Sequence, residues 1–223
     1  MFEGIKPRAG RLIAELAHRQ DREWYAAHKE ELDAQVFQPL RALFEEAKPL
    51  VARLYPRQVI TAKIFRVHRD VRFSNDKSPF KDHASGVLMV GPQKDPSRAA
   101  AALYLQFGPE EGGAAGMWAM DPDALARYRQ AVLDERHGAK LEKLIAPLVS
   151  GGHTVVSAMQ LSRAPRGVDP AHPRVALLRH KGLALDFPPI PRGARHSPAL
   201  LGWCIERARE AAPVVRWLLA HAG

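Results

Sequence analysis

The N-terminal part of the chain shows apolar residues at helical spacing, which predicts a succession of helices. Asp21 is a suitable N-cap for the second of them, because its carboxylate can accept a hydrogen bond from a free N–H of the first turn. Pro39 has no N–H donor and is expected to end or kink that helix. A third helix is expected over residues 40–54.

The pattern changes at residue 59 to that of a β-strand. Residues 59–73 are rich in β-branched and aromatic side chains, and their even positions change from apolar to charged. If one strand runs through the whole segment, four polar residues share one face because side chains alternate with a period of two: Arg66, His68, Asp70 and Arg72. We expect this face to leave the core and enter a cleft, followed by a turn over residues 74–81.

The rest of the chain predicts further strands, then helices around them. Strands are expected at residues 86–90, 101–107, 154–159 and 183–187, with a short one around 117–119 after a turn at 109–113. Helices are expected at residues 122–135, 139–148, 174–180 and 198–219, the first of these capped near Asp121. The strands do not alternate regularly with helices as in a parallel sheet. The fold class is therefore α+β, with a mainly antiparallel sheet packed by N-terminal and C-terminal helices in a single domain, residues 1–223.

The positive charge of the chain is concentrated in two short windows. The formal net charge is +9, from 33 Lys and Arg against 24 Asp and Glu. Residues 63–81 hold six basic and two acidic side chains, and residues 162–181 hold five basic and one acidic. Each window therefore carries +4, which favours a local basic site over a diffusely charged surface.

The number of cysteines and the hydropathy of the chain indicate in which cellular compartment the protein is expected. The single cysteine, Cys204, cannot form an intrachain disulfide and is expected in the core. The first residues lack the apolar stretch of a signal peptide, and no apolar run is long enough to span a bilayer. A cytoplasmic location without a membrane partner is expected.

Residues 66–81 are the candidate functional segment. Clustered arginines match the oxygens of phosphates and carboxylates, so the expected ligand residues are Arg66, Arg69, Arg72, Lys77 and Lys81, joined by Arg163 and Lys181 of the second window. Asp70 and Asp76 are the candidate acids or bases of a catalytic step. We expect the two windows to meet in space and Asp70 to form a buried pair with an arginine, for instance Arg72.

This segment resembles the signature of the domain of unknown function 2461 family, Arg-Asp-x-Arg-Phe-Ser-x-Asp-Lys-Ser/Thr-Pro-Tyr-Lys. The matching residues are Arg69, Asp70, Arg72, Phe73, Ser74, Asp76, Lys77, Ser78, Pro79 and Lys81, with Phe80 in place of the tyrosine. The Asp-Arg-Glu-Trp-Tyr stretch at 21–25, the Gly-Met-Trp at 116–118 and the late stretch at 163–181 extend the resemblance over most of the chain. The resemblance implies a family but no particular reaction.

Three functions remain open at this point. The favoured one is binding or turnover of an anionic small molecule, bearing phosphate or carboxylate, in a basic cleft. The alternatives are a nucleic-acid-binding module that uses both windows, and a structural or interaction protein whose charges pair internally. No cofactor is expected, and no metal site, because the histidines lack ligand spacing. Trp118, close after a glycine, is a candidate pocket residue, whereas Trp24, Trp203 and Trp217 are expected in the core.

Overall fold

The computed structural model describes residues 1–70, 76–92, 95–96 and 98–223. It begins with α1 (Ala9–Arg19) and α2 (Arg22–Leu32), and Asp21 caps α2 as expected, accepting a 2.8 Å hydrogen bond from the Glu23 N–H. A π-helical turn, η1 (Asp33–Phe37), continues the chain into α3 (Gln38–Ala52). Pro39 lies in the first turn of α3, where a missing N–H costs least.

The centre of the fold is a six-stranded antiparallel sheet in the order β1-β2-β3-β4-β6-β5. Its strands are β1 (Ile60–Ile64), β2 (Ala84–Val90), β3 (Ala100–Phe107), β4 (Gly112–Met117), β5 (Thr154–Val156) and β6 (Leu183–Asp186). The connecting and closing elements are α4 (Pro122–Leu133), α5 (Glu135–Ser150), α6 (Val175–Leu178), η2 (Ala194–His196) and α7 (Ala199–His221). The α+β class and the antiparallel sheet are confirmed.

Three strands differ from their predictions, and one of them, β5, ends at Val156 instead of residue 159. The first strand ends at Ile64, so the charged residues after it do not continue the sheet. Beyond it, the described residues include an isolated bridge between His68 and Phe80. The strand expected near 117–119 lies earlier, at Gly112–Met117, where it pairs with β3 on one edge and with β6 on the other. The sequence missed its start because the glycines and alanines of this stretch resemble a turn.

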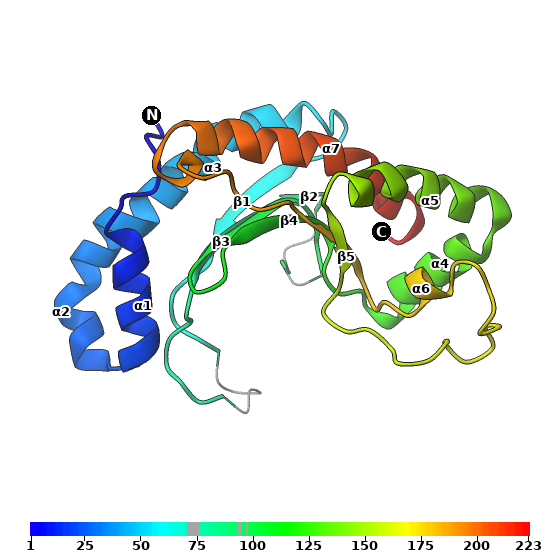
Figure 1. The fold of residues 1–223 in the computed structure, drawn as a ribbon, viewed down its shortest axis with the longest axis horizontal. Coiled ribbons are helices and arrows are strands. Elements are labelled where there is room, and N and C mark those ends of the chain that lie inside the picture. Colours follow the sequence, from blue (N-terminus) through cyan, green and yellow to red (C-terminus); the bar gives the residue numbers. More distant parts are fainter. Residues whose placement is uncertain (71–75, 93–94, 97) are drawn as a thin grey trace.

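The helices cover one face of the sheet. In Figure 1, α3 and α7 lie together above the sheet, α3 against β1 and β2, and α7 against β3 and β4. The main core fills this interface, and it includes Cys204 and three of the four tryptophans, as expected: Trp24, Trp203 and Trp217. Within the described residues, no helix has the length and apolar character needed to cross a membrane.

The strands divide their side chains between this core and the opposite face. Leu88, Leu105 and Leu185 are buried under the helices, whereas neighbours such as Val87 and Tyr104 point to the other side. A bulge in β3 places both Ala102 and Leu103 in the core, so that Ala101 and Tyr104 both face away from it. The side of the sheet opposite α3 and α7 is called the open face below.

Candidate functional site

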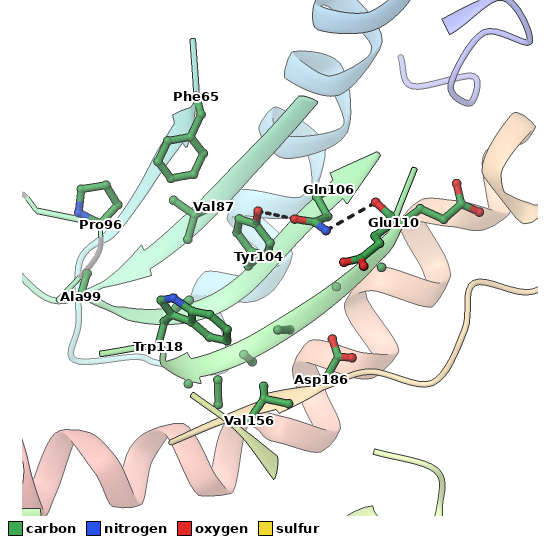
Figure 2. A pocket seen from close by; sticks show the side chains of 18 of the residues that line it. Phe65, Val87, Pro96, Ala99, Tyr104, Gln106, Glu110, Trp118, Val156 and Asp186 are labelled. Atoms are coloured by element: carbon green, nitrogen blue, oxygen red, sulfur yellow. Dashed lines mark hydrogen bonds between the residues drawn. The ribbon is translucent and has the colours of Figure 1, made fainter. Parts of the chain in front are cut away.

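A cavity of about 650 Å³ occupies the open face (Figure 2). Its floor comes from β2, β3, β4, β5 and β6, and most of it consists of residues with little or no side chain: Ala101, Gly112, Ala114, Gly116 and Ala184. A Cβ atom placed on Gly112 would have no heavy atom within 4 Å. The cavity therefore exists because the middle strands present almost no side-chain volume to this face.

Larger side chains stand around this floor. Figure 2 shows Tyr104 and Trp118 over the middle of the floor and Phe65 towards one end. Trp118 is 52% exposed, and it lines the cavity instead of joining the core. The Tyr104 hydroxyl donates to Gln106 Oε1 at 2.7 Å, and Gln106 Nε2 donates to the Glu110 carbonyl at 3.4 Å. These hydrogen bonds fix the orientation of the polar groups beside the floor.

Basic side chains gather beside one end of the cavity, although the residues that line it include Asp95 and no Lys or Arg. Phe65 lines the cavity, and the ammonium groups of Lys81 and Lys63 lie 4.9 and 5.9 Å from its ring centre. Burial lowers the pKa of Lys81, and the nearby charges of Arg66, Arg69 and Lys63 lower it further. Lys63, Arg66, Arg69 and Lys81 are called the basic edge below. Within the described ranges, no carboxylate lies at ion-pair distance from Lys63, Arg66 or Lys81.

Arg69 differs from the other members of the basic edge because its side chain contacts the loop that carries it. Its Nη1 lies 3.2 Å from Asp76 Oδ2, and its Nε donates to the Phe80 carbonyl at 3.3 Å. The backbone pairs alongside, through Arg69 N–H to the Pro79 carbonyl and Lys81 N–H to the Val67 carbonyl. Arg69 therefore joins the two arms of the segment while it contributes charge to the edge.

The segment is also fastened to the N-terminal helices. Gln20, between α1 and α2, accepts a 2.9 Å hydrogen bond from the Phe80 N–H through its Oε1. The Tyr25 ring contacts both His68 and Phe80, with ring centres 5.1 and 4.8 Å apart. Phe80 is only 1% exposed, so this position holds a core side chain. Two stretches that carry the family resemblance, 21–25 and 69–81, thus meet here.

The other end of the cavity is acidic. Glu110, Glu111 and Asp186 line it, and Figure 2 shows Glu110 and Asp186 away from Phe65. Glu111 is held by Arg195 at 2.6 Å. Burial raises the pKa of Asp186, and the charge of Glu110 raises it further. All charged residues that line the cavity are therefore acidic, with Asp95 as the fourth, and the basic edge lies beside it; the sequence pattern did not predict these carboxylates.

The second basic window does not join the basic edge. Residues 65–83 leave the sheet at the end of β1 and start of β2, whereas residues 157–182 leave at the end of β5 and start of β6. These are opposite edges of the sheet, and the register places them at opposite ends of the strands. Figure 1 shows the two segments apart, so the expectation that they meet is wrong.

Arg163 and Lys181, expected as ligand residues from this second window, therefore lie away from the basic edge. Arg163 is exposed, and Lys181 pairs through its backbone with Met120 and Met159. The most buried basic residue of the window is Arg174, which binds Glu142 at 2.8 Å and Glu135 at 3.3 Å. This part of the charge stabilises the packing of α5.

The remaining predicted site residues lie on the segment itself. Asp70 is exposed, so the expectation that it is buried is wrong, whereas its pairing with an arginine stays a prediction because the expected partner Arg72 lies outside the described residues. Asp76 accepts hydrogen bonds from Ser78, which together with the charge of Arg69 lower its pKa. Lys77 is exposed. In the part of the chain that the structure describes, no three His, Cys, Asp or Glu side chains form a metal-binding group.

Comparison with known proteins identifies the family. The family model described as "Conserved hypothetical protein (DUF2461)" matches residues 10–217, which is most of the chain. No curated protein and no solved structure matches it. The chain belongs to the DUF2461 family.

Proposed function

We propose that this protein binds a small organic oxyanion, a molecule with an aromatic or apolar body and a carboxylate or phosphate group, in the cavity on the open face. The body lies on the glycine and alanine floor beside Tyr104 and Trp118, and the oxyanion lies at the basic edge. The observation that carries the proposal is Phe65, which lines the cavity and at the same time lies under the ammonium groups of Lys63 and Lys81.

The electrostatics of the basic edge support an anionic group. Burial is the main reason why the pKa of Lys81 is lowered, and repulsion by the like charges of Arg66, Arg69 and Lys63 lowers it further. An oxyanion between them relieves this repulsion and accepts charge-assisted hydrogen bonds. In the free protein, the positive charges of the basic edge repel each other, and a bound anion would stabilise them.

The cavity supports a small ligand over nucleic acid. A nucleic-acid surface requires positive charge along the path of the phosphates. Here the basic edge is followed across the sheet by the carboxylates of Glu110, Glu111 and Asp186, which repel phosphates. The size of the cavity is in the range of small-molecule sites.

The structure supports binding more directly than turnover. Asp76 has a lowered pKa and interacts with Arg69 and Ser78, so at neutral pH it is a charged, positioning group. Asp70 and Asp76 as acid or base remain a prediction.

The proposal is tested by isothermal titration calorimetry of the full chain with biphenyl-4-carboxylate and biphenyl-4-yl phosphate. Biphenyl-4-methanol serves as the neutral reference, at one ionic strength throughout. We expect saturable binding in wild type, with at least one oxyanion bound about tenfold more tightly than the alcohol, equivalent to about 1.4 kcal/mol.

Two variants separate the contribution of the cavity floor to binding from that of the basic edge. Ala114 lies opposite Tyr104 on the floor, so Ala114→Leu fills the cavity and should abolish binding of all three probes. Lys63→Met with Lys81→Met should reduce the oxyanion affinity to that of the alcohol. Lys48→Met with Lys140→Met, at exposed positions on α3 and α5, removes the same number of charges and should bind as wild type. Absence of saturable binding in wild type, or unchanged binding in Ala114→Leu, contradicts the proposal.

A further inference from the structure

We propose that the ligand of the basic edge is a 2-oxo acid, and that its ketone forms a Schiff base with the side-chain amine of Lys81. This inference rests on the proposed function, because the carboxylate of the 2-oxo acid is the oxyanion that is proposed to bind there. It adds to the same site a covalent step and a substrate class, a 2-oxo acid with an apolar or aromatic body.

The backbone around Lys81 is held in place, so the amine has a defined position. The Lys81 N–H donates to the Val67 carbonyl at 2.8 Å. The preceding residue, Phe80, is buried, and its N–H donates to Gln20 Oε1 at 2.9 Å. The side chain of Lys81 is half-buried, and its ammonium lies 4.9 Å from the ring centre of Phe65. A nucleophile has to be both positioned and accessible, and Lys81 meets both conditions.

The aromatic ring beside the amine belongs to an apolar cluster on the open face. Phe65 packs against Val87 and Met89, and its ring centre lies 6.5 Å from that of Tyr104. Burial is the largest cause of the lowered pKa of Lys81. At a given pH, a larger share of this amine is therefore neutral, and the neutral amine is the form that attacks a carbonyl carbon.

The charged neighbours of Lys81 also favour the neutral amine. The positive charges of Arg66, Arg69 and Lys63 repel its ammonium form. Within the described ranges, no carboxylate lies at ion-pair distance from Lys81. Three acidic residues of the segment and the cavity already have basic partners: Asp76 with Arg69 at 3.2 Å, Asp82 with His83 at 2.7 Å, and Asp95 with Arg98 at 3.8 Å. Lys81 can thus lose its proton without breaking an ion pair.

The position of the amine among other cations selects the substrate. The ammonium groups of Lys81 and Lys63 both lie close to the ring of Phe65. A molecule that reacts with one of them while the other binds its oxyanion needs its carbonyl and its oxyanion close together. In a 2-oxo acid the ketone carbon is bonded directly to the carboxylate. The apolar body can then extend past Phe65 into the cavity that this ring lines.

The proposed step balances without a further reactant. The neutral amine of Lys81 attacks the ketone carbon, a C–N bond forms, and the electron pair of the C=O double bond moves to the oxygen. The two hydrogens of the amine are exchanged through solvent onto this oxygen, which leaves as water as the C–O bond breaks. The product is an imine between Lys81 Nζ and the former ketone carbon. The adjacent carboxylate offsets the positive charge of the imine when it is protonated, and no redox partner is needed.

The test is reductive trapping of the full chain with phenylglyoxylate and sodium cyanoborohydride, followed by peptide mass spectrometry. Cyanoborohydride adds hydride to the protonated imine and converts it into a stable secondary amine. We expect Lys81 to be labelled about tenfold faster than the exposed Lys48 and Lys140, with a rate that saturates as phenylglyoxylate increases. Mandelate has a hydroxyl in place of the ketone, so it should occupy the site without reacting and slow the labelling of Lys81.

The variant Lys81→Arg separates the covalent step from binding. Arginine keeps the positive charge but is not a nucleophile at neutral pH, so the adduct at this position should disappear. The affinity for biphenyl-4-carboxylate should stay within about threefold of wild type. Lys48→Arg, the matched control on α3, should keep both the affinity and the labelling of Lys81.

The outcomes distinguish this inference from the proposed function. If wild type binds biphenyl-4-carboxylate but Lys81 is labelled no faster than Lys48 and Lys140, the Schiff base is overturned and the proposed function stands. Labelling of Lys81 that mandelate does not slow also overturns it, because the reaction then does not occur in the oxyanion site. If neither biphenyl-4-carboxylate nor mandelate binds, the proposed function fails, and this inference fails with it.

Discussion

The ammonium group of Lys81 lies 4.9 Å from the ring centre of Phe65, and the positive charges of Arg66, Arg69 and Lys63 repel it. Burial and the three like charges lower its pKa, so the protonated lysine destabilises the folded state at neutral pH. The same charge is the one that the proposed oxyanion uses. Binding and stability therefore place opposite demands on this residue, a conflict common at functional sites.

Lys81→Met should consequently stabilise the free protein while it weakens binding of the oxyanion. The methionine keeps an apolar stem against Phe65, and we expect the free energy of unfolding at pH 7 to rise by up to about 1 kcal/mol, a small value because solvent screens a half-exposed charge. The gain should shrink in about 1 M salt. Urea denaturation measures both effects, and a loss of stability at low salt would contradict the argument.

The pH dependence of the same variant provides a check with a defined sign. Between its lowered pKa in the folded state and 10.5, Lys81 binds more protons in the unfolded chain. The wild-type free energy of unfolding therefore receives from Lys81 a contribution that rises with pH in this window. Lys81→Met lacks that contribution, so its advantage over wild type should decrease as the pH rises through the window.

At the level of single residues, local rules anticipated much of the structure. Asp21 and Asp121 cap helices because a cap depends only on neighbouring N–H groups. Cys204 and the core tryptophans followed from helical spacing. Arg69 contacts Asp76 and the Phe80 carbonyl and so holds the two sides of the loop together. This role was not predicted, because no local sequence pattern shows which basic residue of a cluster forms such contacts.

Among the elements, the corner between α1 and α2 positions the segment that carries the basic edge. Gln20 adopts a left-handed backbone conformation, φ 51°, which ends α1 and turns its side chain towards the Phe80 N–H. Tyr25 adds ring contacts from α2. The N-terminal helices thus form one side of the support for the candidate site.

Gln20→Ala should therefore destabilise the protein by about 1–3 kcal/mol, because the N–H of the buried Phe80 loses its acceptor. Gln20→Glu retains a side-chain oxygen at the same position and should remain closer to wild type. Chemical denaturation gives the energies. Equal stability of Gln20→Ala and wild type would mean that this hydrogen bond does not hold the segment.

Helices and strands were predicted well where their hydrophobic residues follow a regular period, and poorly where they do not. Amphipathic helices such as α7 carry a long periodic pattern, and the sequence located them well. The first strand was extended too far, because β-branched residues continue after Ile64 although the chain leaves the sheet there. The strand β4, Gly112–Met117, was placed too late because glycine and alanine carry no periodic signal. The floor of the cavity was missed for the same reason.

At the scale of the whole molecule, the two basic windows serve different regions. The prediction of a single site assumed that like charges far apart in the sequence gather together. The order and direction of the strands decide otherwise, and they depend on pairings that composition does not reveal. Arg174 joins α5 to the connection before β6, and Gly138 makes room for it, since a Cβ there would lie 2.9 Å from Arg174 Cδ.

Arg174→Met should destabilise the fold by about 1–2 kcal/mol, because the ion pairs with Glu135 and Glu142 and the hydrogen bond to the Val132 carbonyl are lost, while the access of both carboxylates to solvent limits the loss. Arg166→Met, at an exposed position of the same window, should change stability by less than about 0.5 kcal/mol. Thermal and urea unfolding measure the difference. Similar losses in both variants would show that the effect reflects net charge and not the contacts of Arg174.

The bare floor of the cavity has an evolutionary consequence. Along β4 and β6 the residues that stabilise the core alternate with those that shape the cavity, so the two sets can vary separately. A Cβ at Gly112 meets no neighbour, so this position accepts side chains of many sizes, whereas Gly116 has φ 133° and a Cβ there would lie 2.4 Å from the Leu183 carbonyl oxygen. Substitutions at positions 112 and 114 can therefore change the shape of the cavity without a compensating change under the helices, and under the proposed function they would change the ligand.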